Sequence, residues 1–316
     1  MSSSAAAPRL EDAANDTLTA LPGVRVGHWS DPLARTGCTV VLLPDAGAIT
    51  SGLALGAAPG SRESALLAPE KSVAFAHALL LTGGSAFGLA AAEGVMRLLE
   101  ARGIGHPTPA GPVPIVPAAV LFDLMVGDAR VRPGEREGAA AVEAASAAPV
   151  AMGAVGVGTG ATVGKLVGGF EAAAPSGLGS LVRRVHGASI GALAVSNASG
   201  DLFDPADGAL VAGSGHNGDP ERVSALLEMP TLGNTTLVVV VTDAPLTKVE
   251  AYALAQAAHI GIARVTRPSH TVQDGDTAFV SSTATGPRVG LAALGVAVQE
   301  VVAGALLRGA RAVRVA

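Results

Sequence analysis

The chain has 316 residues, of which 49% are hydrophobic and only 15% are charged. This composition excludes a disordered protein and predicts a compact globule, which we expect to form one domain because single cores reach about 250–300 residues. The net charge of -5 arises from residues scattered without runs, which argues against nucleic acid as a partner. One cysteine, Cys38, excludes an internal disulfide and a cysteine-based zinc site.

The N-terminal residues 1–17 lack the apolar segment of an export signal. We therefore expect a disordered leader, one folded domain over residues 18–316 and a cytoplasmic location. The weakly polar stretch 138–158 contains Glu143 and is not a continuous apolar span of about 20 residues, so no membrane segment is predicted.

In the first half of the chain, β-branched and apolar runs predict strands, and helical periodicity predicts two helices. The expected strands are 24–26, 39–43 and 76–81, and a further apolar run, 118–125, follows a loop over 105–116 that is rich in proline and glycine. The first helix is expected to follow Ser85, as its N-cap, and to stop at Gly103. The second helix, rich in alanine, is expected over 137–147.

In the second half, dense glycine from 153 to 179 predicts irregular backbone packed closely against other elements. Strands are expected at 190–195, 237–241 and 279–282, and the continuous apolar run 237–241 is typical of a strand buried on both faces. The segment 205–230 is expected to be a loop with a short helix at 222–227. Thr247 and Glu250 form a capping box for a helix to about residue 262, and a terminal helix is expected over 289–307.

The segment Gly158–Leu166 resembles a phosphate-binding loop, which makes a nucleotide-binding module a competing hypothesis. The motif fails twice, because Thr159 stands where it requires glycine and Leu166 stands where it requires the Ser or Thr that holds magnesium. The seven histidines show no metal-ligand spacing. No metal and no cofactor is therefore expected.

The tetrad Gly233-Asn234-Thr235-Thr236 stands directly before the predicted buried strand. In a strained turn that glycine permits, the Thr235 hydroxyl can attack the preceding carbonyl, and hydrolysis of the resulting ester cuts the chain. Thr235 would then carry a free amine with an ordinary pKa of about 7.7–8.0, which can serve as general base for its own hydroxyl. Taken alone, Asn-Thr before a strand is also common in ordinary structure.

Asp274 and Asp276 are two residues apart, so their carboxylates project to the same side of an extended backbone. Such a pair could orient a nucleophile and its amine. The alternative is an ordinary Asp-Gly-Asp turn.

These motifs belong to an ordered set that covers nearly the whole chain. The set comprises Pro22–His28, Leu81–Leu89, Gly156–Ala161 with Lys165, Val195–Asn197, Gly233–Thr236 and Asp274–Asp276. In this order the segments resemble the P1 peptidase family of N-terminal nucleophile hydrolases, which includes β-aminopeptidases, D-aminopeptidase-like amidases and the nylon-oligomer endo-hydrolase.

The resemblance implies an α+β fold, an αββα four-layer sandwich of the N-terminal nucleophile hydrolase type. It also implies self-cleavage of the Asn234-Thr235 bond, which would divide one catalytic domain into residues 1–234 and 235–316. The resulting αβ units are expected to assemble into a homo-oligomer, often a tetramer.

The resemblance further implies a role for each of five side chains. Thr235 would be the nucleophile, and Asn197 would donate its side-chain amide to the oxyanion. Lys165 would polarise the nucleophile, while Asp274 and Asp276 would orient it.

Two departures from the family pattern bear on the substrate. The family's aminopeptidases generally use serine as nucleophile, whereas the threonine here is similar to that of the nylon-oligomer hydrolase. Those aminopeptidases also use an acidic residue and a tyrosine in the segment that resembles residues 118–123, where this chain has Val120 and Phe122. The resemblance therefore implies that an amine-binding carboxylate is missing, and that these two side chains form an apolar substrate-binding wall.

We therefore predict an amide hydrolase that cleaves linear oligoamides, such as 6-aminohexanoate (nylon) oligomers, or related small amides through an acyl-enzyme on Thr235. One alternative is an aminopeptidase acting on short β- or D-amino-acid peptides. Another is acyl transfer of the ornithine acetyltransferase kind. The expected partner is a small amide substrate, without nucleic acid or membrane.

Overall fold

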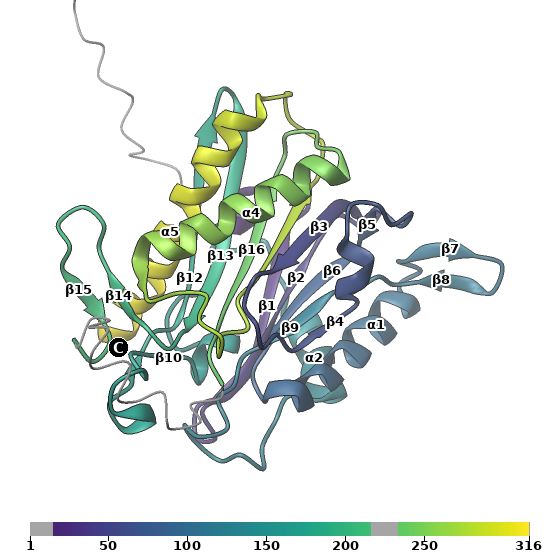
Figure 1. The fold of residues 1–316 in the computed structure, drawn as a ribbon. Coiled ribbons are helices and arrows are strands. Elements are labelled where there is room, and N and C mark those ends of the chain that lie inside the picture. Colours follow the sequence, from purple (N-terminus) through teal and green to yellow (C-terminus); the bar gives the residue numbers. More distant parts are fainter. Residues whose placement is uncertain (1–14, 216–232, 316) are drawn as a thin grey trace, which may run out of the picture.

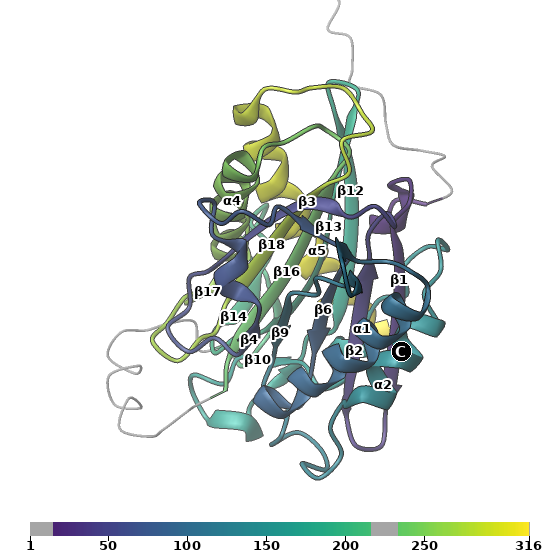
Figure 2. The ribbon, with the colours of Figure 1, turned by 90° about the vertical axis from the view of Figure 1, so that its right-hand side faces the viewer.

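The computed structural model describes residues 15–215 and 233–315. Two β-sheets lie face to face, and helices cover the outer face of each (Figure 1). Figure 2 shows α1 (Ala91–Ala101) and α2 (Glu135–Glu143) on one side of the sandwich, with α4 (Lys248–Val265) and α5 (Leu291–Val315) on the opposite side. The predicted α+β architecture with four layers is therefore present.

The first sheet has the strand order β1-β2-β6-β9-β4 and carries α1 and α2. Its strands are β1 (Arg25–Asp31), β2 (Thr36–Leu42), β6 (Ala78–Thr82), β9 (Ala118–Val120) and β4 (Ser61–Arg62). β6 and β9 are parallel, and the other neighbours are antiparallel.

The second sheet has the strand order β12-β13-β16-β18-β3-β5 and carries α4 and α5. Its strands are β12 (Leu178–Val185), β13 (Ala188–Asn197), β16 (Thr235–Thr242), β18 (Thr277–Ser282), β3 (Ala48–Ala54) and β5 (Phe75–Ala76). Only β16 and β18 are parallel among these neighbours.

Short elements connect and flank the two sheets. The remaining strands are β7 (His106–Thr108), β8 (Gly111–Val113), β10 (Thr162–Val163), β11 (Ala174–Pro175), β14 (Asp201–Phe203), β15 (Leu210–Ala212) and β17 (Thr266–Arg267). The described 3-10 turns are η1 (Leu18–Ala20), η2 (Ser64–Leu67), η3 (Ser85–Ala90), η4 (Gly156–Thr159) and η5 (Gly169–Glu171).

The central strand β16 is buried along its whole length. Because successive side chains alternate between the two faces of a strand, Leu237, Val239 and Val241 enter the core between the sheets. Val238 and Val240 enter the core beneath α4 and α5. The prediction of a strand buried on both faces is confirmed, and β16 places its first residue, Thr235, at a rigid position.

Small residues allow α1 and α2 to cross closely. A Cβ added at Gly94 would lie 1.8 Å from the Glu135 carbonyl oxygen, and one at Gly138 would lie 1.9 Å from the Ala91 carbonyl oxygen. Any larger residue at either position would therefore push the two helices apart.

Most predicted elements are confirmed with shifted ends, and the capping box is present at the start of α4, with Thr247 as N-cap. The N-cap assignment of Ser85 is wrong: its φ is 53°, Gly84 occupies the cap position of η3, and the regular helix begins only at Ala91. Strands β3 and β12 were not expected. The helix predicted at 222–227 lies outside the described residues.

The expected leader, residues 1–17, lies outside the described residues except for its last three. These three residues are packed against the domain, because Thr17 is buried and Asp16 forms an ion pair with Arg308 of α5. The folded part of the chain therefore begins before Leu18.

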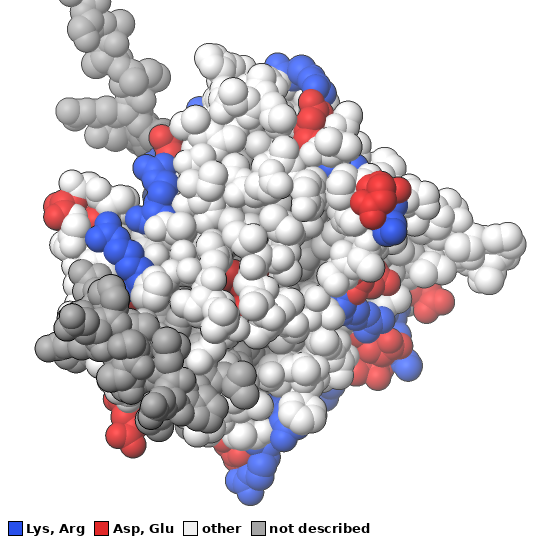
Figure 3. Space-filling view, viewed as in Figure 1, with Lys and Arg blue, Asp and Glu red and all other residues white. Residues whose placement is uncertain are grey.

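By length and composition alone, α5 could cross a membrane over Leu291–Val313. In this fold it packs against β12, β13 and α4, and its apolar side chains form part of the core. On the face seen in Figure 3, basic and acidic side chains lie near one another around the periphery. Among the described residues, Arg288 forms an ion pair with Glu250, and Arg311 forms one with Asp204.

Candidate active site

A cavity of about 320 Å³ opens beside the N-terminal end of β16. Its lining comprises the segments 58–60, 85–86 and 233–235, together with Val120, Phe122 and Gln273. The two residues predicted to bind substrate therefore share this cavity with Thr235. None of the described residues that line it carries a charged side chain.

The turn before β16 depends on glycine at position 233. Gly233 has a φ of 114°, and a Cβ added there would lie 2.4 Å from Cδ1 of Phe122. This turn directs the Thr235 hydroxyl back onto the carbonyl oxygen of Asn234, to which it donates a hydrogen bond. The same carbonyl oxygen accepts the backbone N–H of Gly275 at 2.8 Å. A hydroxyl and a backbone N–H thus meet at one peptide bond, the arrangement that attack on its carbonyl carbon would require.

Asn197 is the last residue of β13 and lies opposite Thr235 in the antiparallel register. Its amide nitrogen donates to the carbonyl oxygens of Phe122 at 3.0 Å and Gly233 at 3.1 Å. Its amide oxygen accepts the backbone N–H of Thr162 at 3.0 Å. These bonds to three separate segments fix the amide with its N–H groups directed at the turn, as an oxyanion donor requires.

Lys165 is buried, so a solvated surface position is excluded. Its Nζ donates to the carbonyl oxygens of Asn197 at 2.7 Å and Thr162 at 3.0 Å. Burial lowers the pKa of Lys165 to about 7, although the charge of Asp274 acts in the opposite direction. Lys165 therefore has a pKa near neutrality, and its Nζ is bound to the carbonyl of the residue that pairs with Thr235.

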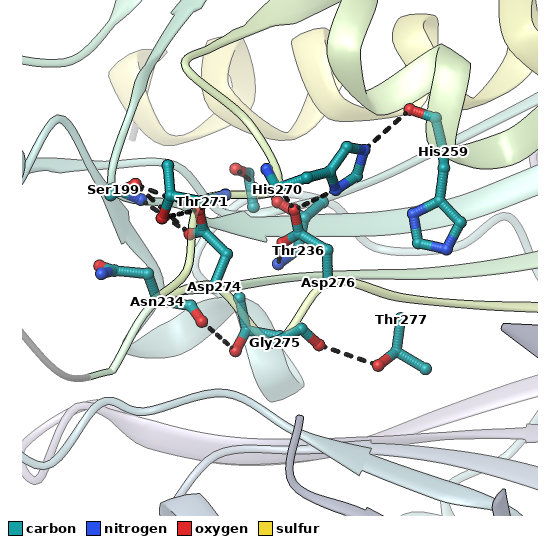
Figure 4. A network of polar contacts seen from close by, with 12 residues as sticks. Ser199, Asn234, Thr236, His259, His270, Thr271, Asp274, Gly275, Asp276 and Thr277 are labelled. Atoms are coloured by element: carbon teal, nitrogen blue, oxygen red, sulfur yellow. Dashed lines mark hydrogen bonds and ion pairs between the residues drawn. The ribbon is translucent and has the colours of Figure 1, made fainter. Parts of the chain in front are cut away.

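Asp276 is fully buried and connects β16 to the loop before β18 (Figure 4). Its Oδ1 accepts the backbone N–H of Thr236 at 2.5 Å, and its Oδ2 accepts the backbone N–H of His270 at 3.1 Å. The ring Nδ1 of His270 lies 2.7 Å from the same Oδ2. Asp276 thus holds the peptide unit that follows Thr235.

Asp274 is also fully buried and is bound from two sides. Its Oδ2 accepts the N–H of Thr271 at 2.8 Å and the Thr271 hydroxyl at 2.6 Å, while its Oδ1 accepts the N–H of Ser199 at 3.3 Å. Burial raises the pKa of Asp274, and the negative charge of Asp276 raises it further. The two carboxylates are therefore part of a buried polar network and not of an exposed turn.

Sequence reasoning missed three contributors to this site: the Gly275 N–H, Ser199 and His270. Gly275 had a signal, since it lies between the two predicted aspartates, and a Cβ added there would lie 2.8 Å from Oγ1 of Thr235. A contact between His270 and Asp276 had no signal in the residue pattern.

The region that resembled a phosphate-binding loop has a different structure. Residues 156–159 form the 3-10 turn η4, and the two-residue strand β10 follows at Thr162–Val163. The strand-loop-helix arrangement that a nucleotide-binding loop needs is not formed. Over residues 15–215 and 233–315, no group of three or more metal-binding side chains occurs either.

Fold and family together define an amide hydrolase of the N-terminal nucleophile type. The chain belongs to peptidase family S58, whose model matches residues 16–314. This confirms the family resemblance.

Among its relatives, an uncharacterised aminopeptidase of Mycobacterium tuberculosis is 43% identical over 288 residues, which cover 85% of this chain and 81% of that protein. An uncharacterised aminopeptidase of Mycobacterium leprae is 41% identical over 297 residues, which cover 85% of this chain and 78% of that protein. The 6-aminohexanoate-oligomer endohydrolase of Paenarthrobacter ureafaciens is 32% identical over 276 residues, which cover 83% of this chain and 73% of that protein.

Solved structures agree with the fold assignment. A β-aminopeptidase of Burkholderia sp. superposes with a TM-score of 0.71 at 21% identity, covering 93% of this chain and 86% of that one. The L-aminopeptidase D-Ala-esterase/amidase of Ochrobactrum anthropi superposes with a TM-score of 0.72 at 18% identity, covering 93% of this chain and 85% of that one. That structure is described as a variant of the Ntn hydrolase fold. The relatives with the higher sequence identity are named aminopeptidases, which favours the aminopeptidase alternative over the predicted oligoamide hydrolase.

Proposed function

We propose that this chain cuts itself between Asn234 and Thr235 and then hydrolyses short peptides or amides from their amino end through an acyl ester on Thr235. The observation that carries the proposal is the hydrogen bond from the Thr235 hydroxyl to the Asn234 carbonyl oxygen. Self-cleavage would yield chains of residues 1–234 and 235–316.

In the first reaction, Oγ1 of Thr235 attacks the carbonyl carbon of Asn234, and the N–H of Gly275 stabilises the negative charge on the carbonyl oxygen. Collapse of the tetrahedral intermediate breaks the C–N bond, so the acyl group passes from nitrogen to oxygen, and the nitrogen keeps its own proton and takes the proton of the hydroxyl to leave as an amine. Water then hydrolyses the ester. The products are the Asn234 carboxylate and a free Thr235 amine.

In the second reaction, that amine takes the proton of its own hydroxyl while Oγ1 attacks a substrate amide, and it passes the proton to the leaving nitrogen as the substrate C–N bond breaks. Water then hydrolyses the acyl ester on Thr235 and restores the hydroxyl. The Asn197 amide donates to the carbonyl of Gly233 in the uncut chain. After cleavage, the new C-terminal end of the first chain can withdraw, which frees this N–H for the substrate oxyanion. One such donor is worth about 3–4 kcal/mol in a transition state.

Two observations bear on substrate choice and point in different directions. The relatives at 43% and 41% identity are named aminopeptidases, which supports exo-cleavage of short peptides. The apolar wall of Val120 and Phe122 favours a second candidate, hydrolysis of uncharged oligoamides, because an unpaired ammonium is costly to bury. N-acetylation of a dipeptide amide distinguishes them: it abolishes turnover by an aminopeptidase and leaves an oligoamide hydrolase active.

The cleavage itself is tested by a denaturing gel of the purified protein with N-terminal sequencing of the smaller band. We expect a sequence that begins Thr-Thr-Leu, and an intact, inactive chain after Thr235→Ala. Thr242→Ala, at the other end of β16, is the matched control and should still be cut. Full activity in Thr235→Ala would refute the proposal.

A further inference from the structure

His270 holds one oxygen of Asp276 with two groups. Its backbone N–H donates to Oδ2 at 3.1 Å, and its ring Nδ1 lies 2.7 Å from the same atom (Figure 4). His270 adopts this position at a φ of 56°, which is uncommon for a residue with a side chain. Strained backbone of this kind persists where the surrounding structure requires it, often at functional sites.

The other nitrogen of the His270 ring is also engaged. Nε2 lies 3.2 Å from the carbonyl oxygen of His259, a position that suits an N–H donor. Nδ1 lies at ion-pair distance from the Asp276 carboxylate but makes no hydrogen bond among the described residues, so the ring acts on Asp276 through the charge that it carries when protonated.

Three other titratable groups lie around His270 and Asp276. Asp274 comes from the loop before β18, His259 comes from α4, and Lys165 acts on Asp274. Burial lowers the pKa of His270, but its close contact with Asp276, the Asp276 charge, the His259 carbonyl and Asp274 outweigh burial and raise it overall. Burial lowers the pKa of His259, whose Nε2 is bound to the Leu53 carbonyl at 3.0 Å. Of the two imidazoles, that of His270 is therefore the one whose surroundings favour the charged form.

We propose that His270 is a positioning residue, which as an imidazolium supplies the counter-charge of Asp276 and so keeps the Thr235 amine available as a base. The inference rests on the proposed function. Asp276 binds the Thr236 N–H, one residue beyond that amine. A buried carboxylate without a counter-charge would favour the protonated amine and raise its pKa, whereas the imidazolium cancels much of this effect.

The test is the pH dependence of kcat/KM for the processed enzyme with His270→Gln, which retains a hydrogen-bond donor and removes the charge. We expect the acid limb to move up by about half a pH unit or more, with a rate loss of about threefold at pH 7. His106→Gln, an exposed histidine on β7, is the matched control and should keep the wild-type profile. A uniform rate loss with an unmoved acid limb would mean a structural role only and overturn the proposal.

A second measurement decides the case if His270→Gln fails to process itself. In the uncut Thr235→Ala protein, NMR titration should give His270 a pKa above the ordinary value of about 6.5, and Asp276→Asn should lower it. A His270 pKa at or below about 6.5, or one that Asp276→Asn leaves unchanged, would overturn the inference. Failure of the proposed function is distinguishable, because Thr235→Ala would then keep its activity whatever the His270 titration shows.

Discussion

Gly233→Ala tests whether the turn before β16 drives self-cleavage. Gly233 has a φ of 114°, where residues with a side chain are strained by about 1–3 kcal/mol. The added methyl group would also lie 2.4 Å from Cδ1 of Phe122, whereas carbon atoms in contact prefer about 3.5–4.0 Å. The turn or the ring must therefore move by roughly 1 Å.

A movement of that size would separate the Thr235 hydroxyl from the Asn234 carbonyl. A misplacement of about 1 Å between reacting groups costs roughly 100-fold in rate, so we expect self-cleavage to slow by about two orders of magnitude. The assay is the time course of the two bands on a denaturing gel, starting from freshly purified uncut protein.

Gly103→Ala is the matched control for backbone strain. Gly103 has a φ of 73°, and a Cβ added there meets nothing within 4 Å. This variant should lose about 1–2 kcal/mol of stability, the cost of a side chain in left-handed backbone, and cleave at the wild-type rate. Wild-type cleavage by Gly233→Ala would show that the strained turn does not position the hydroxyl, and the reasoning would be wrong.

Three further predictions concern the chemistry of the site. Asn197→Ala should reduce kcat of any processed enzyme by about 10²–10³-fold through loss of an oxyanion donor, and an unaffected kcat in steady-state assays would remove Asn197 from that role. Val120→Glu should place a carboxylate in the cavity and favour substrates with a free amine over their N-acetylated forms; an unchanged ratio of kcat/KM values would contradict this. Lys165 has a folded-state pKa of about 7 against an ordinary 10.5, so the unfolded state binds more protons between these values and wild-type stability rises with pH there. In the uncut Thr235→Ala background, the free energy of unfolding of Lys165→Met should therefore fall relative to that of the chain with Lys165 between pH 7 and 9, by up to about 1.4 kcal/mol per pH unit. A pH-independent difference between the two would show that Lys165 keeps an ordinary pKa.

Several local features could be predicted from the sequence because they depend on near neighbours along the chain. The apolar run of β16 specifies a strand buried on both faces, and Thr247 with Glu250 specifies the start of α4. The glycine before Asn234-Thr235 marks a turn whose φ of 114° excludes most other residues. Together these patterns locate the candidate nucleophile at the first residue of a rigid strand.

Other elements were missed because their residues favour no regular structure by themselves. β3 has the sequence Ala-Ile-Thr-Ser-Gly-Leu-Ala, and β12 begins inside the glycine-rich region. Both become strands through pairing with β18 and β13, respectively. Ser85 looked like a helix cap, but its backbone is left-handed and the helix begins at Ala91.

The geometry of the site was decided by tertiary structure alone. Lys165 reaches the carbonyl of Asn197, 32 positions away, because β10 and β13 bring the two segments together. The N–H of Gly275 meets the carbonyl of Asn234 only because β16 and β18 lie parallel in one register. Sequence patterns report side-chain type and local backbone preference, whereas distances of about 3 Å between remote groups follow from strand pairing and core packing.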